Sequence, residues 1–254
     1  MGPASRTDAI VLRRVAYGEA DWVVTLLGLD TGRVSALARS ARRSARRFAG
    51  GLGIGMAGSA LLRERHGADL MILESFDVRT DRHSLSTDLA KTAHMAYALE
   101  LSDRLTPPRQ PEKTVFRLLD SFLARLDAGA ATAVRLRMFE LGLLYALGLG
   151  PSLERCAVCA REDLDDDDVR WVPASGGVVC RGCSARGDLM SGFVRKTLAR
   201  LSTSAFTEAD TVELDRDSAG ACRRAMLALL HEHVPGPLRS LDFIEKISGG
   251  SGSR

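Results

Sequence analysis

The placement of four of the five cysteines constrains this chain more than any other feature. Cys156 and Cys159 form one Cys-x-x-Cys pair, and Cys180 and Cys183 form a second pair further along the chain. Each pair presents two thiolates from one tight turn, which is the arrangement of a tetrahedral four-cysteine zinc site. The fifth cysteine, Cys222, lies within an expected helix and is interpreted as a small buried residue. The pattern predicts one structural Zn²⁺ per chain.

Two disulfides, or a redox Cys-x-x-Cys, are the alternatives to this zinc site. Residues 1–8 are polar and do not resemble a signal peptide, and no window of the sequence approaches a membrane span. We therefore expect the chain in the cytoplasm, where thiols stay reduced. A redox pair would not need a matching second pair. A catalytic zinc keeps one position open, whereas four thiolates close it, so the expected ion is architectural.

The charge of the chain matters through its distribution. A length of 254 residues allows one to three compact units, and a hydrophobic fraction of 45% is ordinary for a globular protein. The net charge of +3 implies little about partners. However, no acidic residue lies between Asp30 and Glu64, a window that contains Arg33, Arg39, Arg42, Arg43, Arg46, Arg47 and Arg63.

The first eighty residues have the pattern of a small β-domain. Apolar or alternating runs predict about five strands, at residues 9–12, 22–27, 33–39, 59–64 and 70–73. Residues 66–69 are a plausible hairpin turn, and a glycine-rich stretch, 50–55, separates the third strand from the fourth. This spacing fits an OB-type barrel. An SH3-like barrel fits almost as well, because periodicity does not choose between them.

Helical spacing replaces this pattern after residue 84. Apolar stripes predict one helix ending near Pro107, a second from Pro111 to Gly129, and a third from Val134 to Gly148. The zinc module follows and encloses the acidic run 165–168, interpreted as a solvated turn. Two or three more helices and a flexible tail complete the chain. The expected fold is α+β and multidomain: an OB-fold β-barrel (1–80), a helical domain in two parts (81–152 and 189–247), an inserted Cys₄ zinc module (153–188), and a tail (248–254).

Several local sequences, in this order, resemble the bacterial recombination mediator family RecO. They are residues 7–12, 17–21, 30–33 and 38–43, followed by the segments around the two cysteine pairs, 155–159 and 179–183. The resemblance covers most of the chain. It implies an OB-fold, then a helical domain, with a Cys₄ zinc module inside the helical part. One departure is Arg39-Ser40, where family members often have Lys-Gly; the charge is kept, but the backbone conformation at Ser40 is left open.

The resemblance implies a non-enzymatic function. RecO-like proteins bind single- and double-stranded DNA, anneal complementary strands, and act with RecR to load RecA onto strands coated by single-strand-binding protein. The implied partners are therefore DNA, RecR and single-strand-binding protein, with no membrane and no small-molecule substrate. The implied location is the cytoplasm, in association with the nucleoid.

The acid-free arginine segment is the predicted DNA-binding site. Phosphate contacts supply most non-specific affinity, and a patch of one sign attracts polyanions. The predicted contacts are Arg39, Arg42, Arg43, Arg46 and Arg47, with Arg33 and Arg63 secondary, and a further patch at Arg195, Lys196 and Arg200. Tyr17, Trp22 and Phe48 are the nearest aromatic candidates for base stacking, and Trp22 is interpreted as core. The alternative is a solvated, mobile loop whose charges have no specific role.

Two other functions compete with DNA binding. A zinc-containing protein–protein adaptor would use the zinc module or a helical face, and its arginines would be incidental. A nucleic-acid-modifying enzyme is disfavoured, because the sequence shows no catalytic triad, no paired catalytic carboxylates and no phosphate-binding loop. A salt-dependent DNA-binding assay would separate the first two.

Overall fold

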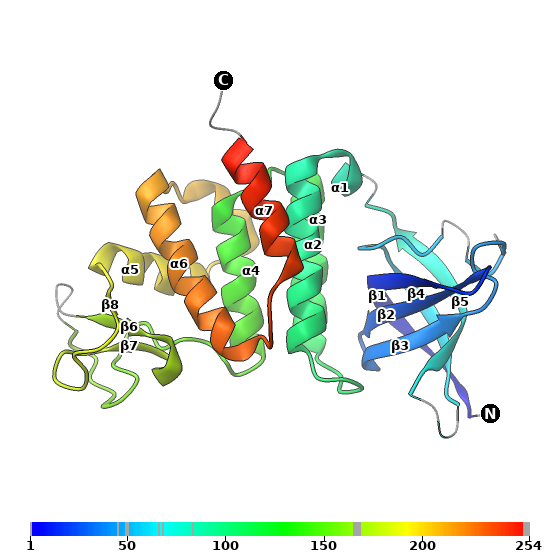
Figure 1. Cartoon of the computed structure of the whole chain (residues 1–254), viewed down its shortest axis with the longest axis horizontal. Helices are drawn as coiled ribbons and strands as arrows, with labels where there is room; N and C mark the ends of the chain where they lie inside the picture. The colour runs from blue at the N-terminus through cyan, green and yellow to red at the C-terminus, as the bar shows by residue number, and fades with distance from the viewer. Residues whose placement is uncertain are drawn as a thin grey trace. The chain divides into compact units, whose positions relative to one another are not determined.

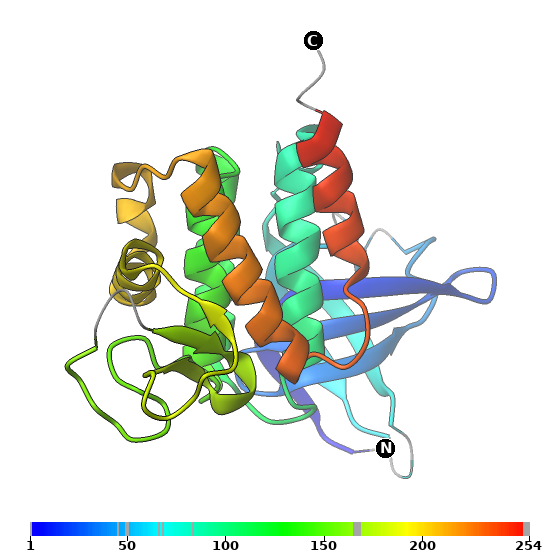
Figure 2. The ribbon, with the colours of Figure 1, turned by 60° about the vertical axis from the view of Figure 1, so that its left-hand side comes forward.

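The computed structural model describes residues 2–44, 46–48, 51–65, 67, 69–82, 84–164 and 169–250, without the side chains of 246 and 248–250. The chain divides into two compact units. Unit 1 comprises Met1–Ala130 together with Leu238–Arg254, and unit 2 comprises Ala131–Pro237. The chain therefore leaves unit 1 after Ala130, builds the whole of unit 2, and returns to unit 1 at Leu238 (Figures 1 and 2).

The described residues between 4 and 80 form a closed barrel with the strand order β1-β2-β3-β5-β4. Its strands are β1 (Ala4–Tyr17), β2 (Asp21–Gly28), β3 (Gly32–Ala38), β4 (Ala57–Arg63) and β5 (Met71–Thr80). Neighbouring strands are antiparallel except for β3 and β5, which pair in parallel at Ala36–Met71. The order confirms the OB-type barrel over the SH3-like alternative.

Strand alternation fills the barrel. Val24, Leu26, Val34, Ala36 and Ala38 point inward from β2 and β3, and they are at most 4% exposed. The connection between β3 and β4 also contributes, since Phe48 and Leu52 are both 2% exposed and belong to the same core. This connection is therefore anchored to the barrel by its own apolar side chains.

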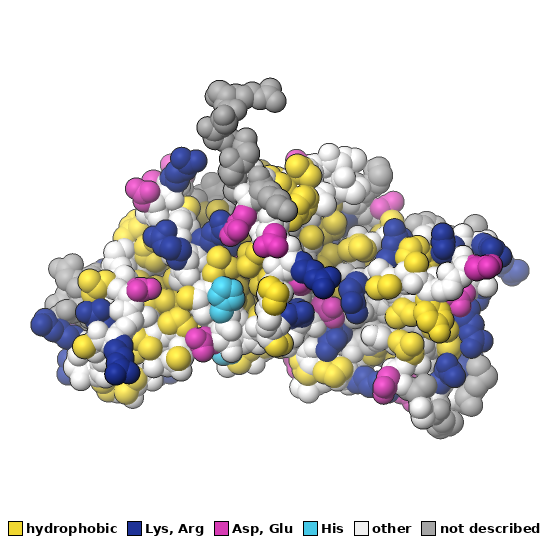
Figure 3. Space-filling view, in the orientation of Figure 1, with side chains coloured by type: hydrophobic (Ala, Val, Ile, Leu, Met, Phe, Trp, Pro, Cys, Tyr) yellow, Lys and Arg dark blue, Asp and Glu magenta, His cyan; other side chains and the backbone are white. Residues whose placement is uncertain are grey.

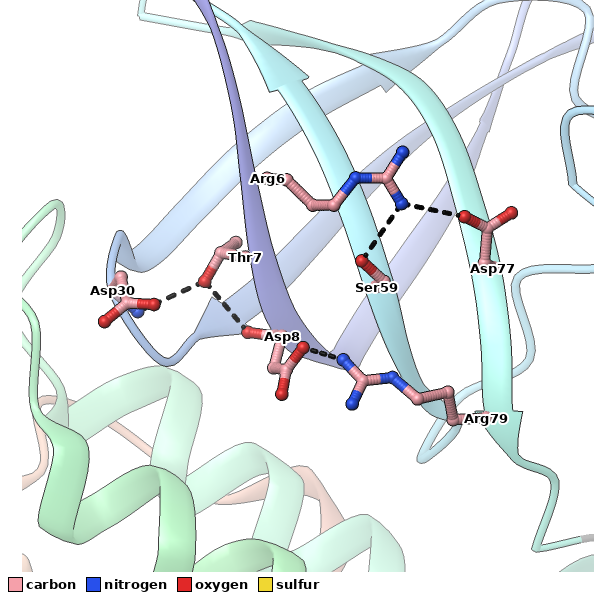
Figure 4. A network of polar contacts seen from close by, with 7 residues as sticks. All are labelled: Arg6, Thr7, Asp8, Asp30, Ser59, Asp77 and Arg79. Atoms are coloured by element: carbon pink, nitrogen blue, oxygen red, sulfur yellow. Dashed lines mark hydrogen bonds and ion pairs between the residues drawn. The ribbon is translucent and has the colours of Figure 1, made fainter.

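On the outside of the barrel, polar side chains of β1 contact side chains of β4 and β5 (Figure 4). The Arg6 guanidinium donates to Ser59 Oγ (3.3 Å) on β4 and to Asp77 Oδ2 (3.0 Å) on β5. Arg79 on β5 pairs with Asp8 on β1. These two arginines each face a carboxylate, so their charge is largely balanced within the barrel.

Four helices complete unit 1: α1 (Ser84–Thr87), α2 (Leu89–Leu105), α3 (Lys113–Ala128) and α7 (Arg239–Gly250). Asp88 caps α2 by accepting from the Lys91 backbone N–H (3.0 Å). The segment leading to Pro107 ends α2, as predicted. Helix α7 packs against α2. The Glu100 carboxylate on α2 accepts hydrogen bonds from the backbone N–H groups of Arg239 (3.1 Å) and Ser240 (2.9 Å).

The buried Arg82, which follows the barrel, contacts both the barrel and α3. Arg82 is 6% exposed; it donates to the Gly55 carbonyl (2.9 Å) and pairs with Asp120 on α3. Gly32, the first residue of β3, has φ +68° and lies against the backbone of Gln110, where a Cβ atom would fall 2.1 Å from the Gln110 oxygen. Only glycine fits this contact.

Unit 2 combines helices with a small sheet. Its elements are α4 (Ala133–Ala146), β6 (Arg170–Val172), the 3₁₀ turn η1 (Pro173–Ser175), β7 (Gly177–Val179), β8 (Asp188–Leu189), α5 (Gly192–Thr203), the 3₁₀ turn η2 (Phe206–Thr211) and α6 (Arg216–His233). The sheet has the order β7-β6-β8. Trp171 on β6 donates its indole N–H to the Ala225 carbonyl on α6 (3.0 Å), which fixes the sheet to the helix.

The two units differ from the predicted domain boundaries. The helical part is divided between the units, because α1–α3 and α7 belong with the barrel, whereas α4–α6 belong with the cysteine module. Helix α7 continues to Gly250, three residues into the predicted tail. Residues 251–254, the acidic run 165–168, and His66 and Ala68 of the predicted turn lie outside the described residues. Among the helices that are described, none has the length and apolarity needed to cross a membrane.

Candidate metal centre and candidate nucleic-acid interface

The four cysteines predicted as ligands meet at one point in unit 2. The sulfur atoms of Cys156, Cys159, Cys180 and Cys183 all lie within 4.8 Å of one another, and no cysteine forms a disulfide. The Cys159 and Cys180 sulfurs are 3.8 Å apart. Metal–sulfur bonds of about 2.3 Å in a tetrahedron place the sulfurs about 3.8 Å apart, so the group fits a metal ion of this kind.

Two tight turns present these sulfurs. In the first, the Ala160 N–H donates to the Cys156 carbonyl (2.9 Å), and Ala160 adopts a left-handed conformation with φ 59°. In the second, the Cys183 N–H donates to the Cys180 carbonyl (3.0 Å). The Cys180 N–H also donates to the Cys156 sulfur (3.4 Å), which ties one turn to the other. Backbone hydrogen bonds thus help to position the four thiols.

The thiols influence one another's ionisation. Burial of Cys156 opposes its ionisation, but backbone N–H groups of Cys159, Cys180 and Val158 donate to its sulfur and hold its pKa at about 6. Hydrogen bonds with Cys159 and Cys180, together with the charge on Cys156, raise the pKa of Cys183 to about 12. Four thiolates therefore coexist here only when a cation compensates their charge, which is what a bound metal ion supplies.

The arginine-rich segment between β3 and β4 is fixed to the barrel at both ends; we call its described residues Arg39–Ser44 and Arg46–Phe48 the basic loop. At its start, the Ser40 N–H donates to Asp21 Oδ1 (2.7 Å), and the Arg42 N–H donates to the Ala20 carbonyl (3.0 Å). At its end, Phe48 is buried and the Phe76 N–H donates to the Arg47 carbonyl (3.0 Å). A solvated, mobile loop, which was the alternative expected from the sequence, would not need such contacts at both ends.

Five predicted arginines are exposed on the basic loop: Arg39, Arg42, Arg43, Arg46 and Arg47. Arg43 lies 3.9 Å from Glu19, with both side chains largely in solvent, so this ion pair is weak. Within the described residues, none of the other four has a carboxylate partner. Arg47 instead donates to the Arg39 carbonyl (2.8 Å). Figure 3 shows Lys and Arg side chains gathered over the barrel.

Trp22 sits at the end of the barrel next to this loop. It is half-buried, packs on the barrel core, and carries the Arg14 guanidinium 4.8 Å from its ring centroid and the Arg42 guanidinium at 5.8 Å. Arg14 also donates to the Leu52 carbonyl (3.0 Å). The prediction that Trp22 is a core residue therefore describes only part of its role, because its ring also orients two cations.

The secondary candidates Arg33 and Arg63 form contacts within unit 1: Arg33 links β3 to α2, and Arg63 links β4 to β5. Arg33 donates to the Thr106 carbonyl (2.8 Å) and pairs with Asp103 (3.2 Å). Arg63 pairs with both carboxylate oxygens of Glu74 (2.6 and 3.3 Å), and this pairing raises the pKa of Arg63. Both guanidiniums are engaged within unit 1, so their place is structural.

The further patch predicted on α5 is smaller than the sequence suggested. Arg195 is only 8% exposed and donates to the Leu153 carbonyl (3.1 Å), so it supports the cysteine module from inside. Its position beside Val194 and Leu198 turns it inward. Lys196 and Arg200 are exposed on the outer face of α5, in line with the exposed Phe193.

Sequence reasoning missed Arg14. The predicted first strand stopped at residue 12, whereas β1 continues to Tyr17 and pairs Arg14 with Val24 of β2. The continuation carried a signal, since Val15 and Tyr17 alternate with Arg14 and Ala16 ahead of a glycine turn. Extending the strand would have placed Arg14 next to Trp22 on the same face.

A five-stranded OB-type barrel, helices and a four-cysteine cluster define a class of modular proteins built around an oligonucleotide-binding fold. The chain matches Recombination protein O N terminal over residues 1–80 and Recombination protein O C terminal over residues 86–242.

Curated relatives match along nearly the whole chain. DNA repair protein RecO of Anaeromyxobacter dehalogenans is 38% identical over 96% of this chain and 96% of its own length. The proteins of the same name from Geobacter sulfurreducens (36%, covering 96% and 98%) and Myxococcus xanthus (34%, covering 94% and 96%) are also similar. The chain belongs to the RecO family, and this membership supports a role in DNA repair and recombination.

Proposed function

We propose that this chain is a non-enzymatic, DNA-binding recombination mediator. It binds single- and double-stranded DNA through the basic loop and promotes annealing of complementary strands. With RecR, it helps RecA to load onto strands coated by single-strand-binding protein. It acts in the cytoplasm, at the nucleoid. Relatives at 34–38% identity named DNA repair protein RecO support the assignment to repair.

The observation that carries the proposal is the set of five exposed arginines on a loop fixed at both ends. A loop whose backbone is already ordered loses less conformational entropy when its side chains contact a phosphate. Of the carboxylates near this loop, Asp21 is engaged by the Ser40 N–H, and Glu19 forms only a weak ion pair with Arg43, so the five arginines outnumber the acidic groups. The loop thus presents a net positive surface to a polyanion.

The proposed ion in the cysteine cluster is Zn²⁺, held by Cys156, Cys159, Cys180 and Cys183. Thiolates and tetrahedral spacing are the preferences of zinc, and four protein ligands close the coordination shell. The ion would stabilise the module rather than react.

The test compares charge reversal on the basic loop with charge reversal elsewhere. The triple variant Arg39→Glu/Arg42→Glu/Arg43→Glu should bind a single-stranded oligonucleotide and a duplex at least about tenfold more weakly. For the wild-type protein, affinity should fall by about two orders of magnitude between 50 and 200 mM salt, and the variant should show a shallower salt dependence.

The control variant Arg117→Glu/Arg125→Glu/Arg216→Glu makes the same charge change at three exposed arginines outside the loop. It should bind DNA nearly as the wild type does. Equal losses in the two triple variants would reduce the effect to net charge and refute the loop as the interface.

A second candidate function is partner docking by unit 2. Leu189 and Phe193 are 65% and 57% exposed. Leu189 lines a groove of about 320 Å³ between β8, α5 and α6, together with Trp171, Met190, Val194 and Ala225. Exposed apolar side chains beside a groove are typical of protein-binding surfaces. If the loop triple variant kept normal DNA affinity while the protein still bound a repair partner, this adaptor function would be favoured.

A further inference from the structure

We propose that Tyr17 is a base-stacking residue that gives the basic loop a preference for single-stranded DNA. This inference rests on the proposed DNA-binding function and assigns to one side chain a contribution that the arginines do not make. Arginine–phosphate contacts are available from both single strands and duplexes, whereas an aromatic ring stacks only on a base that is free of its neighbours.

The aromatic residues near the loop differ in exposure. Phe76, whose N–H donates to the Arg47 carbonyl, is fully buried in the barrel core. Phe48 is 2% exposed and fills the barrel core. Trp22 is half-buried, and the guanidiniums of Arg14 and Arg42 lie over its ring. Tyr17 is 60% exposed. Of these described aromatic residues, Tyr17 is therefore the one whose ring offers an open face.

The backbone holds Tyr17 in a fixed place. It is the last residue of β1 and pairs with Asp21 of β2, and Gly18 begins the turn with φ 58°. Asp21 in turn accepts the Ser40 N–H of the basic loop (2.7 Å). The hairpin that carries the ring and the loop that carries the arginines are thus joined through one carboxylate. Figure 2 shows this hairpin extending from the barrel.

Strand alternation places Tyr17 on the outside of the barrel. Arg14 and Ala16 face the side of Trp22, which packs on the core, so Val15 and Tyr17 face outward. Val15 is also 50% exposed and pairs with Val23. The result is a small apolar surface beside the arginines. In Figure 3, apolar side chains lie on the barrel among the Lys and Arg side chains.

An apolar surface bordered by cations suits a single strand, whose bases and phosphates alternate. Stacking does not depend on counterion release, so its contribution should persist when salt weakens the arginine contacts. Glu19, 93% exposed at the same turn, repels phosphate and favours a base rather than the backbone at this position. These properties separate the Tyr17 contribution from that of the arginines.

The test uses the full chain with Tyr17→Leu, which keeps an apolar side chain but removes the ring, and Tyr17→Phe, which keeps the ring. The probes are an oligothymidine strand and a duplex of equal length, at 50 and 200 mM salt. Tyr17→Leu should weaken binding of the single strand about fivefold or more at both salt concentrations and leave duplex binding within about twofold. Tyr17→Phe should retain wild-type affinity.

The outcomes distinguish this inference from the proposed function. Failure of the wild-type protein to bind either DNA would overturn both. Loss of binding in the loop triple variant, with Tyr17→Leu binding single strands normally, would leave the arginine interface standing and refute the stacking role. Equal weakening of single-strand and duplex binding by Tyr17→Leu, with unchanged folding by circular dichroism, would also refute it.

Discussion

Ser40 shows how one residue sets the conformation of the basic loop. Its φ of 53° is left-handed, a region that costs a residue with a side chain roughly 1–2 kcal/mol. The family resemblance places glycine at this position, and the structure shows that the backbone conformation suits glycine although serine is present. Hydrogen bonds hold the strained residue, since its N–H donates to Asp21 and its carbonyl accepts from Arg43 (3.0 Å).

Replacing this serine should therefore stabilise the protein. We expect Ser40→Gly to raise the free energy of unfolding by about 0.5–1 kcal/mol, because relief of the left-handed strain exceeds the extra entropy of an unfolded glycine. The measurement is the urea midpoint at constant m-value. The control, Ser35→Gly in β3, should lower the midpoint, since glycine weakens a strand. If both changes lowered it alike, the strain at Ser40 would be discounted.

At the scale of elements, the sequence predicted where strands and helices lie along the chain better than which of them pair or pack together. Alternation located the barrel strands, and the turns at Pro107 and Gly129 located helix ends. The parallel pairing of β3 with β5 joins residues far apart in sequence, so periodicity could not reveal it. Strands β6 and β8, of three and two residues, are too short to leave a pattern. Arg195 was predicted to share an outer face with Lys196 and Arg200 from helical spacing alone. The apolar residues Val194 and Leu198 show instead that this side of α5 faces inward.

The sequence predicted that the four cysteines meet at one point, because the spacing within each Cys-x-x-Cys pair itself encodes a tight turn. Its sheet is small, and Trp171, Val178 and Val179 are buried. In a module of this size, metal binding adds folding free energy to that burial.

Removing one ligand should therefore unfold this module. We expect Cys156→Ala to reduce the zinc content per chain and to destabilise unit 2 by at least about 3 kcal/mol. DNA affinity per folded molecule should change less than twofold, because the basic loop belongs to unit 1. Metal analysis, thermal melting and DNA titration would check these outcomes. The control is Cys222→Ala, a buried cysteine on α6 outside the cluster, which should keep its metal. A folded Cys156→Ala protein without DNA binding would contradict a supporting role.

At the scale of the whole molecule, α7 returns the chain to unit 1 after unit 2 is complete. Its N-terminus has a cap from another helix: Glu100 on α2 accepts from the Arg239 and Ser240 N–H groups and from the Ser240 hydroxyl (2.5 Å). Leu238 and Ile244 are buried beside it, at 3% and 8% exposure. No local signal in the sequence links Glu100 to residues so distant, so this contact was not predictable.

The cap should matter for unit 1 only. We expect Glu100→Ala to lower stability by about 1–2 kcal/mol and to increase amide hydrogen exchange in α7 and α2. Exchange in α6 of unit 2 should not change. Glu100→Gln, which keeps an acceptor oxygen, should lose less than half as much. Increased exchange spread equally over α6 would show that the two units do not unfold separately.

The return of α7 also has a consequence for biosynthesis. A ribosome makes the barrel first, but it adds α7 only after residues 131–237 have been translated. Until then, the face of α2 that receives α7 is uncovered, and the Glu100 carboxylate has no helix to cap. The barrel and its basic loop can therefore fold early during synthesis. The helical part of unit 1 can be completed only after unit 2 has been translated.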